Sequence, residues 1–188
     1  ADLGQVAELM VKHKTDWTDR TDRTYSPEIG TPVLMARAER ARNAGEIWER
    51  NGACALEYKL DGLRIQAHVQ KNKAALFSRG LEDVTSMFPD VVRGLGEQIH
   101  EDCIVEGEVI AVGKDGRFLP FQETVQRKRK YNVEEMAIKM PLTIYLFDVL
   151  LANKTNMTDR TYMERRAKLK ELLNGGRTVK LMEQRRVD

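Results

Sequence analysis

Apolar residues recur at steps of three and four in three stretches of the chain, which predicts three amphipathic helices. The stretches are residues 34–51, 88–99 and 159–173, and a period near 3.6 residues places their apolar side chains on one face. The first stretch ends near Asn51-Gly52 and Gly175-Gly176 follows the third, at positions where glycine commonly ends a helix. Each of these helices should therefore bury one side against a core.

Strict alternation of apolar and polar residues predicts strands at residues 53–60 and 63–70. Further apolar segments add strand candidates at 74–78, 103–112, 142–151 and 178–182, with turns at 71–73 and 113–116. Strands outnumber helices and do not alternate with them regularly, which argues against a doubly wound parallel sheet. The predicted fold class is α+β, with mostly antiparallel β-sheets flanked by helices.

Composition and charge narrow the class of protein. The 188 residues are 41% hydrophobic and 32% charged, which fits a folded domain and excludes a disordered chain. The most apolar run, 141–152, is shorter than the ~18 residues that predict a membrane span. The net charge of +2 is too small to predict a polyanionic partner. Two cysteines and three histidines without metal-ligand spacing predict structural roles in a reduced intracellular compartment.

Ionisable residues share one side of the strand predicted at 53–60. The alternation puts Glu57, Lys59 and Asp61 on one side, and Leu56, Tyr58 and Leu60 on the other. Gly62 follows where a side chain would obstruct a close backbone approach, and Arg64 begins the same division on the next strand. A solvent-exposed edge with charges of both signs is the alternative interpretation.

A resemblance to a known superfamily distinguishes these two interpretations. Lys59-Leu60-Asp61-Gly62 resembles the K-x-D-G motif of covalent nucleotidyltransferases, which include DNA ligases, RNA ligases and capping enzymes. The succession EYKLDGLRIQAH, FSRGLEDVT, IVEGEVIAV, PFQETVQRKRK, YLFDVLL and ERRAKLKELL resembles the ATP-dependent DNA ligases of archaea and eukaryotes over nearly all of residues 30–173. The resemblance implies a nucleotidyltransferase (ATP-grasp-like) domain, with ATP and Mg²⁺ as cofactors and nicked double-stranded DNA as substrate.

Position by position, the resemblance implies a role for each of six residues. Lys59 would be the nucleophile that attacks the α-phosphate of ATP and becomes lysyl-AMP. AMP would then pass to the 5′-phosphate of a nick, which the 3′-hydroxyl attacks. The other implied roles are adenine contact for Glu57, ribose and phosphate contact for Arg64, reception of the 5′-phosphate for Arg79, ribose and metal contact for Glu108, and purine stacking for Phe147.

The chemistry of such a reaction needs these residue types. An amine nucleophile must be unprotonated, and free lysine has a pKa of ~10.4, so cations, a metal or partial desolvation must lower it. Arg64 and Arg79 fit that need. Arginines and Mg²⁺ also stabilise the negative charge that builds up at phosphorus and on pyrophosphate. Outside the resemblance, Glu108 reads as an exposed acidic residue and Phe147 as part of a core.

Two basic clusters have both a binding and a structural interpretation. Residues Arg127, Lys128, Arg129 and Lys130 would neutralise DNA phosphates beside the site or form a solvated loop. The same choice applies to the basic residues of the helix predicted at 159–173, which are Arg165, Arg166, Lys168 and Lys170.

Comparison with the complete motif set predicts the domain organisation. The later motifs, E-G-x-x-x-K and a pair of lysines, are absent after Leu173, as is the oligonucleotide-binding barrel. Residues 1–29 are expected to be a linker or the end of an upstream DNA-binding domain, and 30–188 the N-terminal part of the adenylation domain. We expect this piece alone to be weakly active or inactive. The family default is a monomer, with a sliding clamp as partner of the full-length enzyme, in the cytoplasm of a prokaryote or the nucleus of a eukaryote.

Other functions are less consistent with the same residues. An NAD-dependent ligase should carry arginine before the third-motif Gly-Glu, where this chain has Glu106. An RNA ligase or capping enzyme would lack the PFQ…RKRK and ERRxxL stretches. A non-catalytic nucleic-acid-binding module with a vestigial pocket and an α+β domain whose Lys59 is merely exposed are the remaining alternatives.

Overall fold

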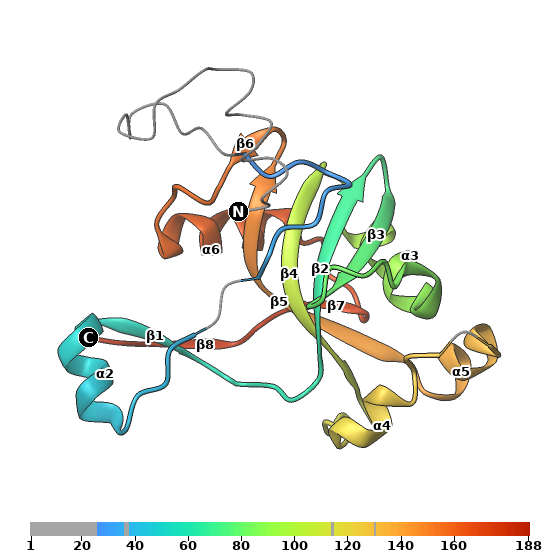
Figure 1. Ribbon diagram of the computed structural model, residues 1–188, viewed down its shortest axis with the longest axis horizontal. Helices are drawn as coiled ribbons and strands as arrows, with labels where there is room; N and C mark the ends of the chain where they lie inside the picture. Colours follow the sequence, from blue (N-terminus) through green and yellow to red (C-terminus); the bar gives the residue numbers. More distant parts are fainter. Residues whose placement is uncertain (1–25, 36–37, 114, 130) are drawn as a thin grey trace.

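A six-stranded sheet forms the centre of the protein. The computed structural model describes residues 26–35, 38–113, 115–129 and 131–188. The strand order is β3-β2-β4-β5-β6 with β7 beside β5, and only the β5–β7 pair is parallel (Figure 1). This confirms the α+β class with mostly antiparallel sheets. The strands are β2 (Leu63–Gln70), β3 (Lys73–Ser78), β4 (Cys103–Ala111), β5 (Leu142–Ala152), β6 (Thr155–Asn156) and β7 (Val179–Leu181).

A tight turn joins β2 to β3 where the sequence predicts one. Gln70 pairs with Lys73, so Lys71 and Asn72 form a two-residue loop, and their φ angles are 50° and 60°. Positive φ at both loop residues matches the right-handed twist of the flanking strands. The turn therefore fixes the register between β2 and β3.

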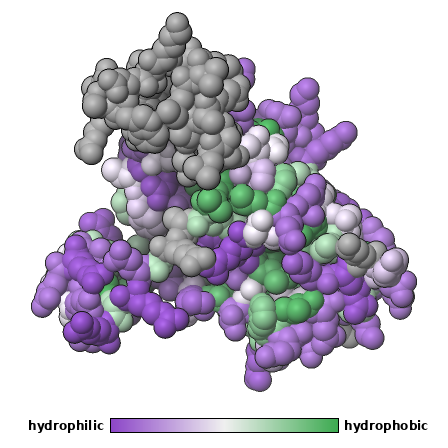
Figure 2. Space-filling model, viewed as in Figure 1, coloured by the Kyte–Doolittle hydropathy of each residue, from purple (hydrophilic) through white to green (hydrophobic). Residues whose placement is uncertain are grey.

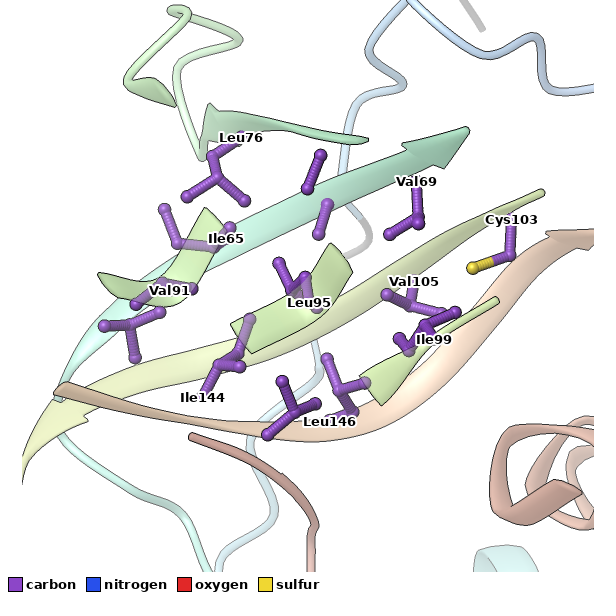
Figure 3. Packing of buried hydrophobic residues seen from close by; sticks show 14 of the residues in the cluster. Ile65, Val69, Leu76, Val91, Leu95, Ile99, Cys103, Val105, Ile144 and Leu146 are labelled. Carbon is purple, nitrogen blue, oxygen red and sulfur yellow. The ribbon is translucent and has the colours of Figure 1, made fainter. Parts of the chain in front are cut away.

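One face of the sheet, which we call the core face, packs against helix α3 (Pro89–Gln98). Leu95 and Val91 of the helix interdigitate with side chains of β2, β4 and β5 (Figure 3). Burial of these apolar side chains is the main favourable contribution to folding. The buried cluster includes Ile65, Val69, Leu76, Val91, Leu95, Ile99, Cys103, Val105, Ile144 and Leu146.

The opposite face of the sheet, which we call the polar face, carries the side chains that alternate with the core residues. Residues 26–35 cross it as an extended segment (blue in Figure 1).

Helix α6 (Tyr162–Leu172) contacts β5. It begins with a capping box, in which Thr161 and Glu164 each bind the other's backbone N–H. The structure thus confirms the helix predicted at 159–173.

A second, two-stranded sheet lies beside the first and differs from the prediction. Strand β1 (Cys54–Glu57) pairs with β8 (Gln184–Val187). The strand predicted at 53–60 therefore ends at Glu57, and Leu56 and Tyr58 are 50% and 65% exposed. Alternation holds a strand in place only where one face is buried, and the described residues provide no layer that buries this one.

The first predicted helix is also shorter than expected. Helix α2 (Ala44–Asn51) replaces the helix predicted at 34–51, begins after the capping residue Asn43 and buries none of its side chains. Short helices α4 (Phe121–Val125) and α5 (Val133–Lys139) and a 3-10 turn, η2 (Thr85–Met87), were not predicted, because such short helices show little of the 3.6-residue period. Among the described residues, no helix is long and apolar enough to cross a membrane. Residues 1–25, predicted as a helix end and linker, lie outside the described residues.

Candidate active site

Lys59 lies in an irregular loop that joins the two sheets. Residues 58–61 leave β1 without secondary structure, and Lys59 is exposed. The loop reaches β4 at Gly62, whose N–H donates to Glu108 Oε1 at 3.1 Å. A Cβ at Gly62 would lie 2.3 Å from the carbonyl oxygen of Val109. The structure confirms the close backbone approach that the sequence predicts, and it anchors the lysine loop beside Glu108.

Glu108 faces Arg64 across neighbouring strands. The two residues are partners in the β2–β4 register. Burial raises the pKa of Glu108 above its usual value, while the Gly62 N–H and the positive charges of Arg64 and Lys59 act in the opposite direction. Among the described residues, Oε1 alone of this carboxylate has a hydrogen-bond partner. Glu108 is thus a carboxylate held by the loop, with its second oxygen available to a ligand.

A stacked pair of side chains lies on the same face. The guanidinium of Arg64 lies 4.3 Å from the centroid of the Phe147 ring, within the range of a cation–π contact. Phe147 has no partner in the β4–β5 register, because Glu106 pairs with Asp148 and Gly107 pairs with Leu146. Such β-bulges redirect side chains and occur often beside active sites. The bulge therefore directs the half-buried Phe147 towards Arg64.

Arg64 also forms an ion pair with the other acidic residue of β4. Its NH2 donates to Glu106 Oε2 at 2.6 Å, and Glu106 is 5% exposed. The predicted site residues Lys59, Arg64, Glu108 and Phe147 are thus connected through one loop and three neighbouring strands. Arg79 is exposed just beyond Ser78, which pairs with Ile65 at the same end of β2.

Glu57, the predicted adenine contact, is held by helix α6. Its Oε1 lies 2.7 Å from the Tyr162 hydroxyl and accepts a hydrogen bond from Arg166 NH1 at 3.3 Å. Burial and the carboxylate of Glu57 raise the pKa of Tyr162. Arg166 also donates to the carbonyl of Met182. The sequence analysis did not assign Tyr162 to the site, because its contact with Glu57 joins residues far apart in the chain.

Ion pairs also account for other basic residues of α6. Arg165 forms a two-pronged contact with Asp148, at 2.7 and 3.1 Å, and Lys168 pairs with Glu101 at 2.9 Å. Bidentate arginine–carboxylate pairs fix geometry as well as charge. The ERR stretch therefore fastens α6 to the sheet through Arg165 and to β1 through Arg166, which favours the structural interpretation of both arginines.

The basic cluster at 127–130 requires a correction. Arg127 is 1% exposed, and its guanidinium donates to Asp90 Oδ1 at 2.7 Å and to the carbonyl of Met140 at 3.3 Å. The prediction that Arg127 contacts DNA is wrong for this structure, because a charge run gives no information on burial. Lys128 is exposed near Glu82 at 3.6 Å, Arg129 donates to the Gln126 carbonyl, and Lys130 lies outside the described residues.

The polar face also contains two buried side chains that the sequence analysis did not assign to the site. Gln66 and His68 follow Arg64 at alternate positions of β2 and are 0% and 2% exposed. Alternation with buried apolar residues was the signal that could have found them. Among the described residues, no group of three or more His, Cys, Asp or Glu side chains is arranged to hold a metal ion.

The antiparallel sheet and the lysine loop beside Arg64, Glu108 and Phe147 define the class of protein as nucleotidyltransferase-like. Comparison with known proteins then identifies the family. The family described as "ATP dependent DNA ligase domain" matches residues 35–188. The chain belongs to this family. A probable DNA ligase of Dictyoglomus turgidum is 42% identical over 183 residues, which cover 95% of this chain and 30% of the relative. A DNA ligase of Thermococcus onnurineus is 39% identical over 187 residues, covering 98% and 33%.

Solved structures agree on the fold. Mycobacterial DNA ligase D complexed with ATP and MES aligns with a TM-score of 0.52 at 18% identity, over 70% of this chain and 40% of that chain. The ligase domain from M. tuberculosis LigD gives 0.53 at 19% identity, with the same coverage. The chain spans about a third of the length of the curated relatives named above.

Proposed function

We propose that this chain is the N-terminal part of the adenylation domain of an ATP-dependent DNA ligase, and that it carries the lysine that becomes lysyl-AMP. The observation that carries the proposal is the Gly62–Glu108 hydrogen bond, which brings the Lys59 loop to the strand that faces Arg64. The relatives named DNA ligase support the whole enzyme's activity. In the parent enzyme, AMP passes to the 5′-phosphate of nicked duplex DNA and leaves when the 3′-hydroxyl attacks.

In the first step, Lys59 Nζ forms a bond to the α-phosphorus of ATP and the bond to pyrophosphate breaks. Phe147 stacks on the purine. The purine takes the place of Arg64 on the Phe147 ring, and Arg64 moves towards the phosphates, where its charge stabilises the transition state. Glu108 and the phosphate oxygens would hold Mg²⁺, which when bound neutralises charge on the leaving pyrophosphate. Glu57 contacts the adenine from the end of β1.

Cations at the surface, of which Arg129 is half-buried, would contact the DNA. Arg79, at the end of β3, receives the 5′-phosphate, and Lys128 and Arg129 contact the backbone. Lys130 belongs to the same predicted cluster but lies outside the described residues. A sliding clamp as partner and a monomeric state are family expectations for the full-length enzyme.

Intact-mass measurement after incubation with ATP and Mg²⁺ tests the first step. We expect the wild-type chain to gain slowly the mass of one AMP, and Lys59→Ala to gain none. Lys71→Ala is the matched control, because Lys71 is an exposed lysine in the β2–β3 turn. Labelling of Lys59→Ala at the wild-type rate, or AMP located on another residue, would contradict the proposal. NAD or GTP in place of ATP separates the related nucleotidyltransferase classes.

A non-catalytic nucleic-acid-binding module is the second candidate function. The exposed Arg79 and Lys128 and the half-buried Arg129 favour it. In that case DNA binding would not change with ATP or with Lys59→Ala, and neither protein would gain mass.

A further inference from the structure

A fully satisfied amide lies at the centre of the polar face. Gln66 is 0% exposed, and its side-chain oxygen accepts from the Val33 N–H at 2.8 Å and from His68 Nε2 at 3.0 Å. Its side-chain nitrogen donates to the Val33 carbonyl at 3.1 Å and to Glu106 Oε1 at 3.0 Å. All four hydrogen-bonding positions of the amide are used, so its orientation is fixed.

His68 fixes the same amide from the other side. The Gly30 N–H donates to His68 Nδ1 at 2.9 Å, so the ring proton is on Nε2, which donates to Gln66. His68 is 2% exposed and stacks edge-on against Phe77 with 4.7 Å between ring centroids. The segment Gly30–Val33, which we call the strap, is thus attached to the sheet at both of its ends.

The same network ends at the candidate active site. Gln66 holds one oxygen of Glu106 and Arg64 holds the other. In turn, Glu106 accepts the only hydrogen bond that the Arg64 guanidinium donates among the described residues, and that guanidinium lies over the Phe147 ring. A carboxylate whose two oxygens both accept hydrogen bonds cannot rotate without losing one of them. Supporting residues orient the groups that touch a ligand in this way.

We propose that Gln66 is a positioning residue for adenylation: held by the strap, it fixes Glu106, and Glu106 is the pivot about which Arg64 moves between Phe147 and the phosphates. The catalytic consequence rests on the proposed function, since it assumes that Arg64 serves ATP. The geometric part, that Gln66 sets the place of Arg64, does not depend on ATP. Misplacement of a charged group in a reaction site costs rate more than binding.

The test compares Gln66→Met with Gln70→Met. Both substitutions replace glutamine on β2, but Gln70 is exposed and lies beyond the network, where its amide approaches Asp102 at 3.4 Å. The first readout is the NMR resonance of the Arg64 Nε–H, identified by its loss in Arg64→Lys. The Phe147 ring shifts this proton upfield, and we expect Gln66→Met to move it downfield and Gln70→Met to leave it unchanged.

The second readout is AMP labelling followed over time. We expect the labelling rate at saturating ATP to fall about tenfold in Gln66→Met, with the ATP concentration for half-maximal rate changed less than about threefold. An unmoved Arg64 resonance in Gln66→Met overturns the positioning role. AMP labelling of Lys59→Ala at the wild-type rate overturns the proposed function, and the resonance still decides whether Gln66 positions Arg64.

A second variant, in the strap, tests the proposal if Gln66→Met does not fold. Val33→Pro removes the N–H that donates to Gln66 and leaves the sheet sequence unchanged. We expect a smaller downfield movement of the Arg64 resonance, because one of the four bonds of the amide is lost. No movement in a folded Val33→Pro protein would overturn the part of the proposal that assigns the locking of Gln66 to the strap.

Discussion

The two faces of the six-stranded sheet bury side chains equally well by different means. On the core face, Ile65 and Val105 are 1% and 0% exposed and contact other apolar groups. On the polar face, Gln66 and Glu106 are 0% and 5% exposed, and each is held by hydrogen bonds. Apolar contacts are non-directional, whereas a buried hydrogen-bond network has one low-energy arrangement. The core face therefore supplies stability, and the polar face supplies defined positions for the chemistry.

The visible surface of the protein is mixed in character. Hydrophilic side chains cover most of the visible surface, with smaller apolar areas among them (Figure 2). The polar face combines a buried network with the exposed Lys59 at its margin. Variants of the two faces should therefore affect different measurements.

The largest effect is expected from a buried ion pair on the core side. Arg127→Met should lower the free energy of unfolding by about 3–5 kcal/mol, because Asp90 loses the partner that lies 2.7 Å away. Urea denaturation measures the loss. Arg129→Met, in the same segment with a more accessible side chain, should change stability by less than about 0.5 kcal/mol. Equal stability of the two variants would show that Arg127 is not a structural residue.

An apolar truncation on the core face should have the next largest effect. Leu95 of α3 is 0% exposed, so Leu95→Ala should cost about 2–5 kcal/mol through lost burial and a residual cavity. Leu34→Ala is the control, since Leu34 is 60% exposed. Thermal and urea unfolding give the difference. If the two faces are independent, the Arg64 resonance in folded Leu95→Ala should keep its wild-type position. A shift of that resonance would show that the two faces are coupled.

Sequence patterns predicted the central sheet well, because alternation there reports real burial. The strand predicted at 63–70 has those bounds in the structure, and the strand predicted at 142–151 ends one residue later. The same alternation at 53–60 and the helical spacing at 34–51 lacked a core to pack against. The structure shortens both, to β1 and α2. Periodicity predicts an element only as far as tertiary contacts support it.

Several residues predicted for the candidate site lie together in the structure, but their connections had no sequence signal. Lys59, Gly62, Arg64, Glu108 and Phe147 are grouped in the structure as the motifs suggest. The links from Gln66 to Glu106 and to Val33 span 40 and 33 residues, and only the strand register and the path of the strap bring these residues together. For Arg127 the predicted role itself was wrong, because its place in a run of charges suggested an exposed side chain, whereas the structure buries it.

Acid should destabilise the polar face through His68. Burial lowers the pKa of His68 from 6.5 to about 4, so the unfolded chain binds the proton first as the pH falls. The free energy of unfolding should therefore be fully present above pH 6.5 and decrease by up to about 3 kcal/mol as the pH falls towards 4. Denaturation at several pH values measures this slope.

A pair of histidine variants isolates that slope from other titrations. His68→Gln should flatten the dependence between pH 6.5 and 4, because no ring remains to be protonated. His100→Gln should keep it, since His100 is exposed. Carboxylates titrate in both variants and cancel in the comparison. The same slope in the two variants would contradict the assignment to His68.

The smallest effect on stability, and a large one on chemistry, is expected where the lysine loop meets β4. In Gly62→Ala the new Cβ would lie 2.3 Å from the Val109 carbonyl oxygen and 3.1 Å from Glu108 Cγ, so the backbone must move away. Overpacking of this kind costs about 1–3 kcal/mol. The displaced loop carries Lys59, and a shift of about 1 Å at a reacting group can cost roughly a hundredfold in rate.

Gly175→Ala provides the matched control for that variant. No atom lies within 4 Å of a Cβ at Gly175, so the same added methyl group should leave both stability and AMP labelling near wild type. Gly62→Ala should label at least tenfold more slowly than Gly175→Ala, measured by intact mass at temperatures where both are folded. Equal rates would show that the Gly62–Glu108 contact does not place Lys59. In that case, the polar face would hold its buried network without positioning the nucleophile.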